Sequence, residues 1–577
     1  MFFPGFCSVF LTQRVAPKQA LTLLYAMTNR EIAKNFQFLG SIMELHGENP
    51  FKIRSYQNAY RTLRALDEPL AGMGDEEISA IKGVGSAISG KIRELLETGQ
   101  MQTLEKYKAK TPEGIQEMLN IKGFGPKKIM AVWQGLGVES VGELLYAVNE
   151  NRLVELKGFG KKTQDELRKQ LEYYQRSKHK SHYAAVEAEA DALLDAVQKK
   201  LPGVKAGLCG AIRRRENVVE RIELLIGQSG PLDALFKGGL LEKEGEQGGA
   251  LLAHTAEARP VAVYQCSPET YGSELFRLSG QPAFLDAFAR EFPALGIDGL
   301  PEEQAVFDKA GLPFIAPELR EQPWGLQLAL DGELPVLIET EDIKGVVHAH
   351  STYSDGGHSL RDMALYTREL GYEYLAITDH SKSAFYANGL QPERLYQQWE
   401  EIDALNLELA PFRIFKGIES DILNDGTLDY DEDILKGFDL IIASIHSNLR
   451  MDEAKATQRL ITAIENPYTR ILGHPTGRLL LSRQGYPIDH KAVIDACAAN
   501  GVAIELNANP YRLDLDWSWI PYALEKGVRI SINPDAHSKE GIHDIRFGVM
   551  SARKGGLSAG NCLNALGVEA FGKWVLG

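Results

Sequence analysis

The spacing of apolar residues changes character along this chain of 577 residues. In the front part, apolar positions recur at helical spacing over residues 86–96, 127–134 and 161–174, which predicts amphipathic helices. From about residue 338 onward, short apolar runs alternate with longer helical patterns, at residues 359–370, 392–409, 452–464 and 490–500. Alternating strands and helices predict a parallel sheet covered by helices. A chain of this length is expected to hold several domains.

The apolar runs of the second half lead into side chains that bind metal ions. Runs at residues 346–347, 374–378, 440–445 and 528–532 each end near a histidine or an aspartate. Strand ends are where barrel enzymes place catalytic residues. The candidate donors are His348, His350, Asp355, Asp379, His380, Glu419, His446, His474, Asp535 and His537.

A donor set of imidazoles and carboxylates suits Zn²⁺, Mn²⁺ or Fe²⁺ better than Ca²⁺. Because the set is larger than one ion can use, it predicts a polynuclear hydrolytic centre. Bound ions there would lower the pKa of a water molecule, so that metal-bound hydroxide is the nucleophile. The alternative is that these histidines are hydrogen-bonded structural residues, and one His-x-His pair alone would not decide between the two.

A Lys-Gly-hydrophobic-Gly motif occurs three times in the front half. Each copy follows one amphipathic stretch and opens another, so its glycines would permit a tight turn between helices. Backbone amides at the start of the next helix would face a phosphate, which predicts salt-dependent binding of DNA without base preference. Single Gly-x-Gly turns also end ordinary helices, and one copy could serve packing alone. The candidate DNA-binding residues are Lys82, Gly83, Gly85, Lys122, Gly123, Gly125, Lys157, Gly158 and Gly160.

The net charge of −15 is unevenly distributed. Residues 30–180 carry 24 Lys and Arg against 20 Asp and Glu, whereas the rest of the chain carries 39 against 58. The basic excess of the front half favours a polyanionic partner only weakly, since charge runs usually form solvated faces. Bound cations would offset part of the acidity of the second half.

Composition also bears on location. The five cysteines lack Cys-x-x-Cys spacing, which argues against a disulfide framework and indicates a reducing, cytoplasmic compartment. No apolar run reaches the ~20 residues that span a membrane. Residues 1–27 are expected to be an unstructured leader or an extension upstream of the true start, with a signal peptide as the alternative.

The donors lie in segments that resemble the PHP (polymerase and histidinol phosphatase) domain: "HAHSTYSDGG", "ITDHS", "GIESDI", "SIHS", "LGHPTGRLL", "ELNANPYRLDLD" and "NPDAHS". The resemblance implies a distorted (β/α)₇ barrel that holds up to three Mn²⁺ or Zn²⁺ ions. It also implies that Asp379 is a supporting carboxylate. It assigns three sets of ligands: His348, His350, Glu419 and Asp535; Glu419, His446 and His474; and Asp355, His380 and His537.

Two arginines in the same segments are candidate phosphate contacts. Arg478 and Arg512 could each hold a phosphate through a planar, two-pronged guanidinium. The alternative for either residue is an ordinary ion pair that braces a loop.

Residues 47–63, "GENPFKIRSYQNAYRTL", resemble the N-terminal helical domain of bacterial family X DNA polymerases. The repeated turns resemble the helix-hairpin-helix motifs of DNA repair proteins. In family X, a lysine after the first hairpin can form a Schiff base with an abasic sugar, and the matching residue is Lys91. A solvated lysine or a phosphate contact is the favoured alternative, because a lyase lysine needs a lowered pKa.

The middle of the chain departs from the family X pattern. Palms of that family hold two Mg²⁺ ions with three aspartates, whose positions here match Arg221, Glu223 and, by a looser alignment, Ala262. The serine of the preceding Gly-Ser turn is Ala211. An arginine repels a cation and an alanine offers no oxygen, which predicts a palm that has kept its fold and lost polymerase activity. The arginines at 213–215 would contact phosphates or cover acidic neighbours.

The whole chain therefore resembles a family X polymerase with a C-terminal PHP domain. The predicted fold is multidomain α/β: all-α helix-hairpin-helix domains, an α+β nucleotidyltransferase-like palm, and a distorted (β/α)₇ barrel. The predicted parts are a leader (1–27), a helical N-terminal domain (28–100), a fingers-like helix-hairpin-helix domain (101–182), a degenerate palm and thumb (183–330) and the PHP domain (338–577).

The function that these features predict is metal-dependent hydrolysis of DNA. The resemblance implies a 3′→5′ exonuclease with processing of abasic sites or blocked 3′ ends during repair, and the protein is expected to be monomeric. Three alternatives stay open: a gap-filling polymerase with retained activity, a non-catalytic DNA-binding scaffold, and a small-molecule phosphatase similar to histidinol phosphatase. Arg221 disfavours the first, the complete ligand set the second and the hairpins the third.

Overall fold

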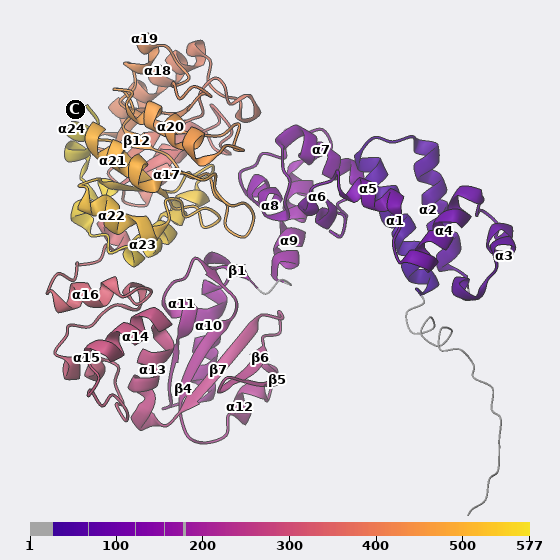
Figure 1. Ribbon diagram of the computed structural model, residues 1–577. Helices are drawn as coiled ribbons and strands as arrows, with labels where there is room; N and C mark the ends of the chain where they lie inside the picture. The colour runs from indigo at the N-terminus through magenta and orange to yellow at the C-terminus, as the bar shows by residue number, and fades with distance from the viewer. Residues whose placement is uncertain (1–26, 67, 122, 155, 177–179, 577) are drawn as a thin grey trace, which may run out of the picture. The chain divides into compact units, whose positions relative to one another are not determined.

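The computed structural model describes residues 27–66, 68–121, 123–154, 156–176 and 180–576 (Figure 1). It divides into two compact units, one ending at Ser140 and the other beginning at Val141. The predicted leader, apart from Met27, lies outside the described residues. Within the described parts of the chain, no helix is both long and apolar enough to cross a membrane.

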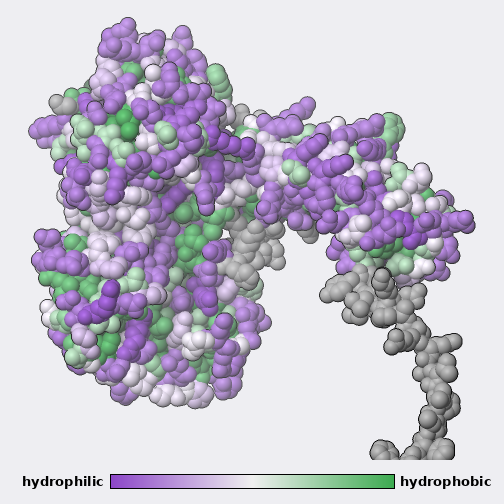
Figure 2. All heavy atoms as spheres, in the orientation of Figure 1, coloured by the Kyte–Doolittle hydropathy of each residue, from purple (hydrophilic) through white to green (hydrophobic). Residues whose placement is uncertain are grey.

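The first unit is entirely helical in its described residues. Its core is formed by the apolar faces of amphipathic helices, with Phe36, Leu39 and Ile42 completely buried. Hydrophilic residues cover most of its visible face (Figure 2). Its helices are α1 (Asn29–Leu45), α2 (Pro50–Arg64), α3 (Asp75–Ala80), α4 (Ser86–Thr98), α5 (Gln102–Lys108), α6 (Glu113–Met118) and α7 (Pro126–Leu136).

The second unit begins with two helices, α8 (Val141–Asn149) and α9 (Lys161–Arg176), and continues into a five-stranded mixed sheet. In spatial order the strands are β2 (Lys205–Leu208), β4 (Ile222–Gly227), β7 (Pro260–Cys266), β6 (Ala250–His254) and β5 (Glu242–Gln247). Strands β4 and β7 are parallel, and the other pairs are antiparallel. A small antiparallel pair, β1 (Ser181–His182) and β3 (Val218–Val219), lies beside this sheet region.

Helices pack on the five-stranded sheet and then form a separate helical layer. The helices around the sheet are α10 (Glu187–Lys200), α11 (Gly210–Arg213), α12 (Asp233–Phe236) and α13 (Tyr271–Ser279). Three more helices share an aromatic core around Phe276, Phe284 and Phe307. These are α14 (Pro282–Glu291), α15 (Gln304–Ala310) and α16 (Trp324–Leu330).

The C-terminal part is a nearly closed barrel of seven parallel strands, which confirms the predicted (β/α)₇ architecture. The sheet runs in sequence order from β8 to β14, and a parallel bridge between Ala349 and Ala536 closes it. The strands are β8 (Gly345–Ala349), β9 (Tyr374–Ile377), β10 (Arg413–Asp421), β11 (Leu440–Ser444), β12 (Ile471–Leu472), β13 (Ala503–Asn507) and β14 (Ile530–Asn533).

Helices surround the barrel, and every residue of its strands is buried apart from Arg413 and Lys416. Strands buried on both faces are typical of parallel sheets. The helices are α17 (Leu360–Glu369), α18 (Pro392–Leu409), α19 (Glu432–Leu435), α20 (Glu453–Ile464), α21 (His490–Asn500), α22 (Ile520–Glu525), α23 (Ile545–Lys554) and α24 (Val568–Leu576).

A buried ionic contact joins the barrel to the preceding helical layer. Lys554, at the end of α23, is fully buried; it donates to the carbonyl of Arg214 at 3.0 Å and to Glu321 at 2.5 Å. Glu216 lies 3.7 Å from the same ammonium group. A buried lysine needs such partners, because an unpaired charge inside a protein is strongly destabilising.

Candidate metal centre and nucleic-acid interface

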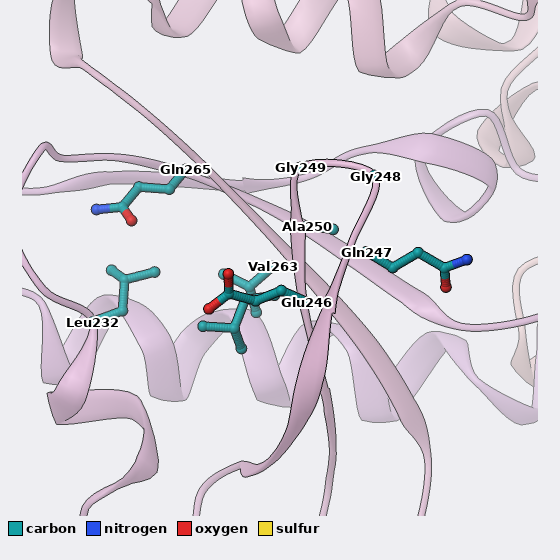
Figure 3. Close-up of a pocket in the computed structure, with 9 residues that line it drawn as sticks. Leu232, Glu246, Gln247, Gly248, Gly249, Ala250, Val263 and Gln265 are labelled. Atoms are coloured by element: carbon teal, nitrogen blue, oxygen red, sulfur yellow. The ribbon is translucent and has the colours of Figure 1, made fainter. Parts of the chain in front are cut away.

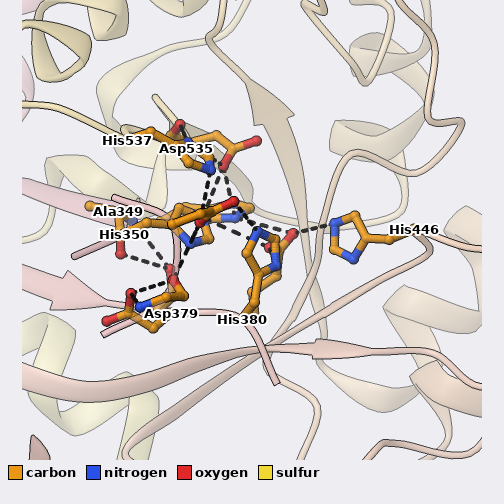
Figure 4. A network of polar contacts seen from close by, with 12 residues as sticks. Ala349, His350, Asp379, His380, His446, Asp535 and His537 are labelled. Carbon is orange, nitrogen blue, oxygen red and sulfur yellow. Dashed lines mark hydrogen bonds and ion pairs between the residues drawn. The ribbon is translucent and has the colours of Figure 1, made fainter. Parts of the chain in front are cut away.

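The nine predicted metal ligands converge at the C-terminal ends of the barrel strands. Because parallel strands all end at the same mouth of a barrel, residues far apart in sequence meet there. His348 and Glu419 lie on β8 and β10, and the other seven follow β8, β9, β11, β12 and β14. Figure 4 shows His537 and Asp535 on one side of this cluster and His446 on the other.

Glu419 lies at the centre of the cluster and is completely buried. Its Oε1 is 3.0 Å from His474 Nε2, 3.1 Å from His446 Nε2 and 3.3 Å from His348 Nε2. Its Oε2 is 2.9 Å from His380 Nδ1 and 3.8 Å from His350 Nε2. A carboxylate that meets five imidazoles with both oxygens is placed to bridge metal ions.

Potential ligand atoms fall into three overlapping groups, each within 4.8 Å. Their membership differs from the ligand sets expected from the sequence, and none of the three includes His474. His350 also lies with the group of Asp355, His380 and His537, and His380 also lies with Glu419 and His446. The remaining group unites His348, His350 and Asp535. The ligand sets are therefore shared between neighbouring positions rather than separate.

Buried polar atoms in the cluster test whether it fits metal ions. The described residues provide no hydrogen-bond partner for His348 Nε2, His350 Nδ1, His380 Nδ1, His474 Nδ1 or Glu419 Oε2. Leaving a buried polar atom without a partner costs about 1–3 kcal/mol. So many such atoms, all nitrogen or carboxylate oxygen and all at one barrel mouth, fit a set of cation ligands.

Charge is unevenly balanced inside the cluster. Burial lowers the pKa of His380, but Asp355 and Glu419 outweigh this effect and raise that pKa to about 10. Burial is likewise outweighed at His446 by Glu419 and Asp421, which raise its pKa to about 9. His350 goes the other way, because burial and the neighbouring His537 and His380 lower its pKa to about 4. The carboxylates thus attract positive charge, which protons or divalent cations can supply.

Carboxylates outside the nine ligands orient the histidines. Glu505, on β13 and fully buried, lies 2.6 Å from His348 Nδ1, and Asp421 lies 2.5 Å from His446 Nδ1. Such outer carboxylates fix which ring nitrogen faces a metal. The sequence analysis missed both, although Asp421 stands two residues after Glu419 and so on the same face of β10.

Asp379 braces the loop between the first ligands. Its carboxylate accepts hydrogen bonds from the Ser351 amide at 2.8 Å, the Ser354 amide at 3.1 Å and the Gln398 side chain at 2.6 Å. None of the three groups of ligand atoms includes Asp379. These contacts match the supporting role expected from the family resemblance.

His348 and Asp535 have left-handed backbones at the seam where the barrel closes. Their φ angles are +66° and +53°, a region that costs a non-glycine residue roughly 1–3 kcal/mol. The seam holds them in place, since the His350 amide donates to the Ala536 carbonyl at 2.9 Å and the Ala536 amide donates to the His348 carbonyl at 3.2 Å.

The two candidate phosphate arginines differ in their surroundings. Arg478 donates to Asp516 at 2.6 Å and to the carbonyls of Arg512 and Leu513, which are the contacts of a loop brace. Arg512 lies 3.9 Å from Asp535 and donates to the Tyr146 hydroxyl at 2.8 Å, so it borders the metal cluster. Its guanidinium is buried, and its exposed fraction is 7%.

The three Lys-Gly-hydrophobic-Gly motifs form three equivalent turns. The first glycine of each has positive φ: +91° at Gly83, +77° at Gly123 and +96° at Gly158. The hydrophobic residue is buried and donates its amide to a carbonyl three residues back, at 2.9, 3.1 and 3.0 Å. These turns connect α3 to α4, α6 to α7, and α8 to α9.

The second glycine of each motif precedes a helix, and its surroundings are open. Gly85 and Gly125 are the N-caps of α4 and α7, and the Gly160 carbonyl accepts from the Gln164 amide of α9 at 3.0 Å. No atom lies within 4 Å of where a Cβ would be at any of the three. Lys82 and Lys157 are exposed, Lys122 lies outside the described residues, and Lys91 is half-buried on α4. The helix starts are therefore accessible to a phosphate backbone.

The residues that match polymerase ligands also meet in space. Glu223 pairs directly with Ala262 across β4 and β7, and Arg221 precedes β4 by one residue. The Glu223 carboxylate accepts a hydrogen bond from the Ala211 amide at 2.9 Å. It is the one carboxylate among the three matched positions, and it caps the start of α11.

The three neighbouring arginines, at positions 213–215, form ion pairs within the protein. Arg213 forms a bidentate pair with Glu303 at 2.8 and 2.7 Å. Arg214 lies 3.2 Å from Glu321, and the side chain at position 215 lies 3.5 Å from Glu318. These contacts favour the acidic-neighbour alternative over phosphate binding.

A groove lies beside the hairpin of β5 and β6 (Figure 3). Its lining includes Leu232, Glu246, Gly248, Val263 and Gln265, with no histidine and no basic side chain. This lining has one carboxylate, Glu246, and no cluster of metal-ligand side chains comparable to that at the barrel mouth.

Three family models match parts of the chain. A helix-hairpin-helix domain matches residues 27–101, a SAM-like helix-hairpin-helix tandem matches residues 115–172, and the PHP domain matches residues 347–509. The two helical matches contain all three turns, and the PHP match contains the ligands from His348 to His474 as well as Glu505.

Curated relatives agree with this division. The chain is 35% identical over 571 residues to the DNA polymerase/3′-5′ exonuclease PolX of Bacillus subtilis, a match that covers 94% of this chain and 99% of that protein. It is also 31% identical over 203 residues to a probable phosphatase of Caldanaerobacter subterraneus, covering 33% of this chain and 74% of the phosphatase.

Proposed function

Because the chain belongs to the PolX family, we propose that it is a DNA-binding, metal-dependent phosphoesterase that removes nucleotides in the 3′→5′ direction. The observation that carries this proposal is the convergence of nine imidazole and carboxylate donors at one barrel mouth, seven of them buried and Asp355 and His446 partly exposed. The nine are His348, His350, Asp355, His380, Glu419, His446, His474, Asp535 and His537.

Up to three Mn²⁺ or Zn²⁺ ions would occupy these donors. When bound, such ions supply an activated water and stabilise the negative charge that develops on a phosphodiester. The protein's own contribution is to hold the donors in place through Glu505, Asp421 and Asp379, and to present Arg512 at the edge of the centre.

The three turns would hold the DNA backbone. Contacts from helix amides and nearby lysines to phosphates carry no base information. Binding is therefore expected to be independent of sequence and to weaken steeply with salt. Substrates would be 3′ ends, including ends blocked or exposed during repair, and the protein would act as a monomer. The proposed domains are residues 28–100, 101–182, 183–330 and 338–577, which follow a leader of residues 1–27.

The five-stranded sheet region is proposed to be an inactive polymerase palm. Glu223 is the one oxygen ligand among the three matched positions, and its carboxylate is engaged by the Ala211 amide. Two Mg²⁺ ions need several oxygen ligands. The region would then join the hairpins to the barrel and contribute to DNA contact.

The test compares substrates and variants in one assay. A 5′-labelled duplex with a recessed 3′ end is incubated with Mn²⁺ and the wild-type protein or His350→Ala, and products are resolved by length. We expect stepwise shortening from the 3′ end by wild type, none by the variant, and unchanged DNA binding by both. If wild type instead hydrolyses only a small phosphomonoester, the phosphatase alternative holds, and if no substrate is hydrolysed, the scaffold alternative holds.

A further inference from the structure

The metal centre is bordered by a segment from outside the barrel. Residues 141–152, here called the α8 segment, comprise α8 and the three residues after it. Glu143 forms an ion pair with Arg483 at 2.8 Å, and the hydroxyl of Tyr146 accepts a hydrogen bond from Arg512 at 2.8 Å. Arg152 lies 4.6 Å above the ring of Tyr386. The segment therefore contacts three different loops at the barrel mouth.

The fit between the α8 segment and the barrel is close. A Cβ atom at Gly142 would lie 2.3 Å from the Cβ of Ser482, so only glycine permits this approach. Tyr146 is 6% exposed, and its ring lies 4.7 Å from the Arg512 guanidinium carbon. A buried tyrosine that stacks on an arginine at the edge of the centre holds the segment in one position.

Glu150 reaches the metal cluster from this segment. Its exposed fraction is 5%, and its Oε1 accepts a hydrogen bond from Asn509 at 3.2 Å. Its Oε2 is in ion-pair contact with Nδ1 of His537, one of the nine candidate ligands. That oxygen is buried, and the imidazole of His537 is the charged group that it meets.

The ring of His537 has two distinct sides. Its Nδ1 meets Glu150 and lies 2.9 Å from the carbonyl oxygen of Asp535. Its Nε2 lies 3.4 Å from Asp355, inside the group that also contains His350 and His380. With acceptors on the Nδ1 side, the proton belongs on Nδ1 and the Nε2 lone pair faces the cluster.

We propose that Glu150 is a positioning residue of the metal centre, supplied by the helix-hairpin-helix part of the chain. Its carboxylate orients His537 and fixes the Nδ1–H form, so that Nε2 can bind the ion shared with Asp355 and His380. Carboxylate–histidine–metal arrangements of this kind tune metal affinity in many enzymes. The barrel alone would then hold this ion weakly, and the docked α8 segment would complete the site.

This inference rests on the proposed function only for the identity of the ions. The contact that carries it is local and joins His537 to Glu150. It links the third hairpin to hydrolysis, because Glu150 lies in the connection between α8 and α9 that also contains Gly158 and Gly160. Any event that undocks the α8 segment would lower the occupancy of one ion.

The experiment measures Mn²⁺ binding to the full-length protein after chelator treatment, by calorimetry and by elemental analysis after dialysis. Three variants probe position 150: Glu150→Ala removes the carboxylate, Glu150→Gln removes its charge, and Glu150→Asp keeps the charge. The matched control is Glu143→Gln, which breaks the ion pair with Arg483 on the same helix without touching a candidate ligand.

We expect Glu150→Ala to weaken one class of bound Mn²⁺ by roughly 10- to 100-fold, with the other ions unchanged. Glu150→Asp is expected to recover part of the affinity, and Glu143→Gln to bind as wild type does. Hydrolysis of a 3′-recessed duplex by Glu150→Ala should return as Mn²⁺ is raised, without a change in KM for DNA.

Wild-type affinity and stoichiometry in Glu150→Ala would overturn the inference. A loss in Glu143→Gln as large as that in Glu150→Ala, with Glu150→Asp no better than Glu150→Ala, would also overturn it, because the carboxylate at position 150 would then contribute nothing of its own. If wild type binds Mn²⁺, loses one ion on Glu150→Ala and yet cleaves no DNA, the inference stands and the proposed function fails. If wild type cleaves DNA and Glu150→Ala binds metal normally, the proposed function stands and the inference fails.

Discussion

The metal centre and the palm-like sheet both gather charged side chains, but they satisfy them differently. At Glu223 the carboxylate accepts from a backbone amide, and the arginines nearby pair with Glu303 and Glu321. At Glu419 five imidazoles meet one carboxylate, and several of their polar atoms have no partner among the described residues. In the palm-like sheet the charged side chains are paired with one another, whereas in the metal centre their arrangement suits bound cations.

This difference separates a structural residue from a functional one more clearly than residue type does. A buried charge that is fully paired within the protein is costly to unpair and leaves nothing for a ligand. A cluster of buried donors with missing partners costs stability and therefore indicates a bound group.

The largest effect is expected from the two central carboxylates. Glu419→Ala should reduce 3′→5′ hydrolysis by on the order of 10³-fold or more, at least what the loss of one transition-state donor costs. Glu223→Ala should leave hydrolysis within twofold of wild type. Both are measured on the same labelled duplex with Mn²⁺. Template-directed primer extension that Glu223→Ala abolishes would instead show that the palm is active.

The next largest effect is expected on stability, when the buried contact between the barrel and the helical layer is broken. Lys554→Met leaves Glu321 and Glu216 without their ammonium partner, which is expected to lower the free energy of unfolding by roughly 3–5 kcal/mol. Chemical denaturation measures this loss. The double variant Lys554→Met/Glu321→Leu removes one of these two carboxylates and should recover part of the loss. Equal stability of all three proteins would mean that the contact contributes nothing.

Two buried histidines should respond to acid in opposite ways. Among the described residues no carboxylate pairs with His182, and burial lowers its pKa from 6.5 to about 4, whereas Asp355 and Glu419 raise that of His380. For His182 the folded pKa is depressed, so its stabilising contribution is present above pH 6.5 and is lost as pH falls towards 4. The contribution is on the order of 3 kcal/mol.

The measurement is the free energy of unfolding between pH 7 and pH 4. His182→Gln should reduce the fall in the free energy of unfolding between pH 7 and pH 4. His254→Gln, at a side chain that is 30% exposed, should not. An unchanged fall in His182→Gln would contradict the buried neutral state.

The smallest expected effect is thermal. Mn²⁺ at a hundred times its dissociation constant should stabilise the folded protein by about 2.7 kcal/mol, because it binds the assembled centre and not the unfolded chain. The melting temperature should rise on addition of Mn²⁺ and fall back with a chelator. Glu223→Ala should show the same rise and Glu419→Ala little or none. A rise of equal size in Glu419→Ala would place the ions elsewhere.

Much of the architecture could be predicted from local patterns. Apolar runs of strand length, alternating with helical periodicity, predicted a parallel sheet covered by helices, and the resemblance to the PHP domain implied the seven-stranded barrel. Strand ends indicated where His348 and His446 would meet. The Lys-Gly-hydrophobic-Gly repeats predicted turns, and positive φ at Gly83, Gly123 and Gly158 accounts for the first glycine of each. Period, turn chemistry and ligand type are properties of short segments.

The remaining parts depend on distant contacts. Glu505 could have been found, because it alternates with Asn507 on β13 and both face the centre. No local sequence pattern marks Glu150, because its partner His537 is distant in the sequence. Only the docked α8 segment brings the two residues together. The same holds for Arg478, whose brace with Asp516 depends on how two loops approach each other.

The left-handed backbones of His348 and Asp535 have a consequence for evolution and engineering. A glycine would relax either position but would remove a ligand, and most other side chains would keep the strain without the chemistry. The strain is tolerable only while the first and last strands stay joined. Closure of the barrel and the arrangement of its metal ligands therefore depend on the same contacts. A substitution that weakens the pairing between the first and last strands should reduce activity before it unfolds the protein.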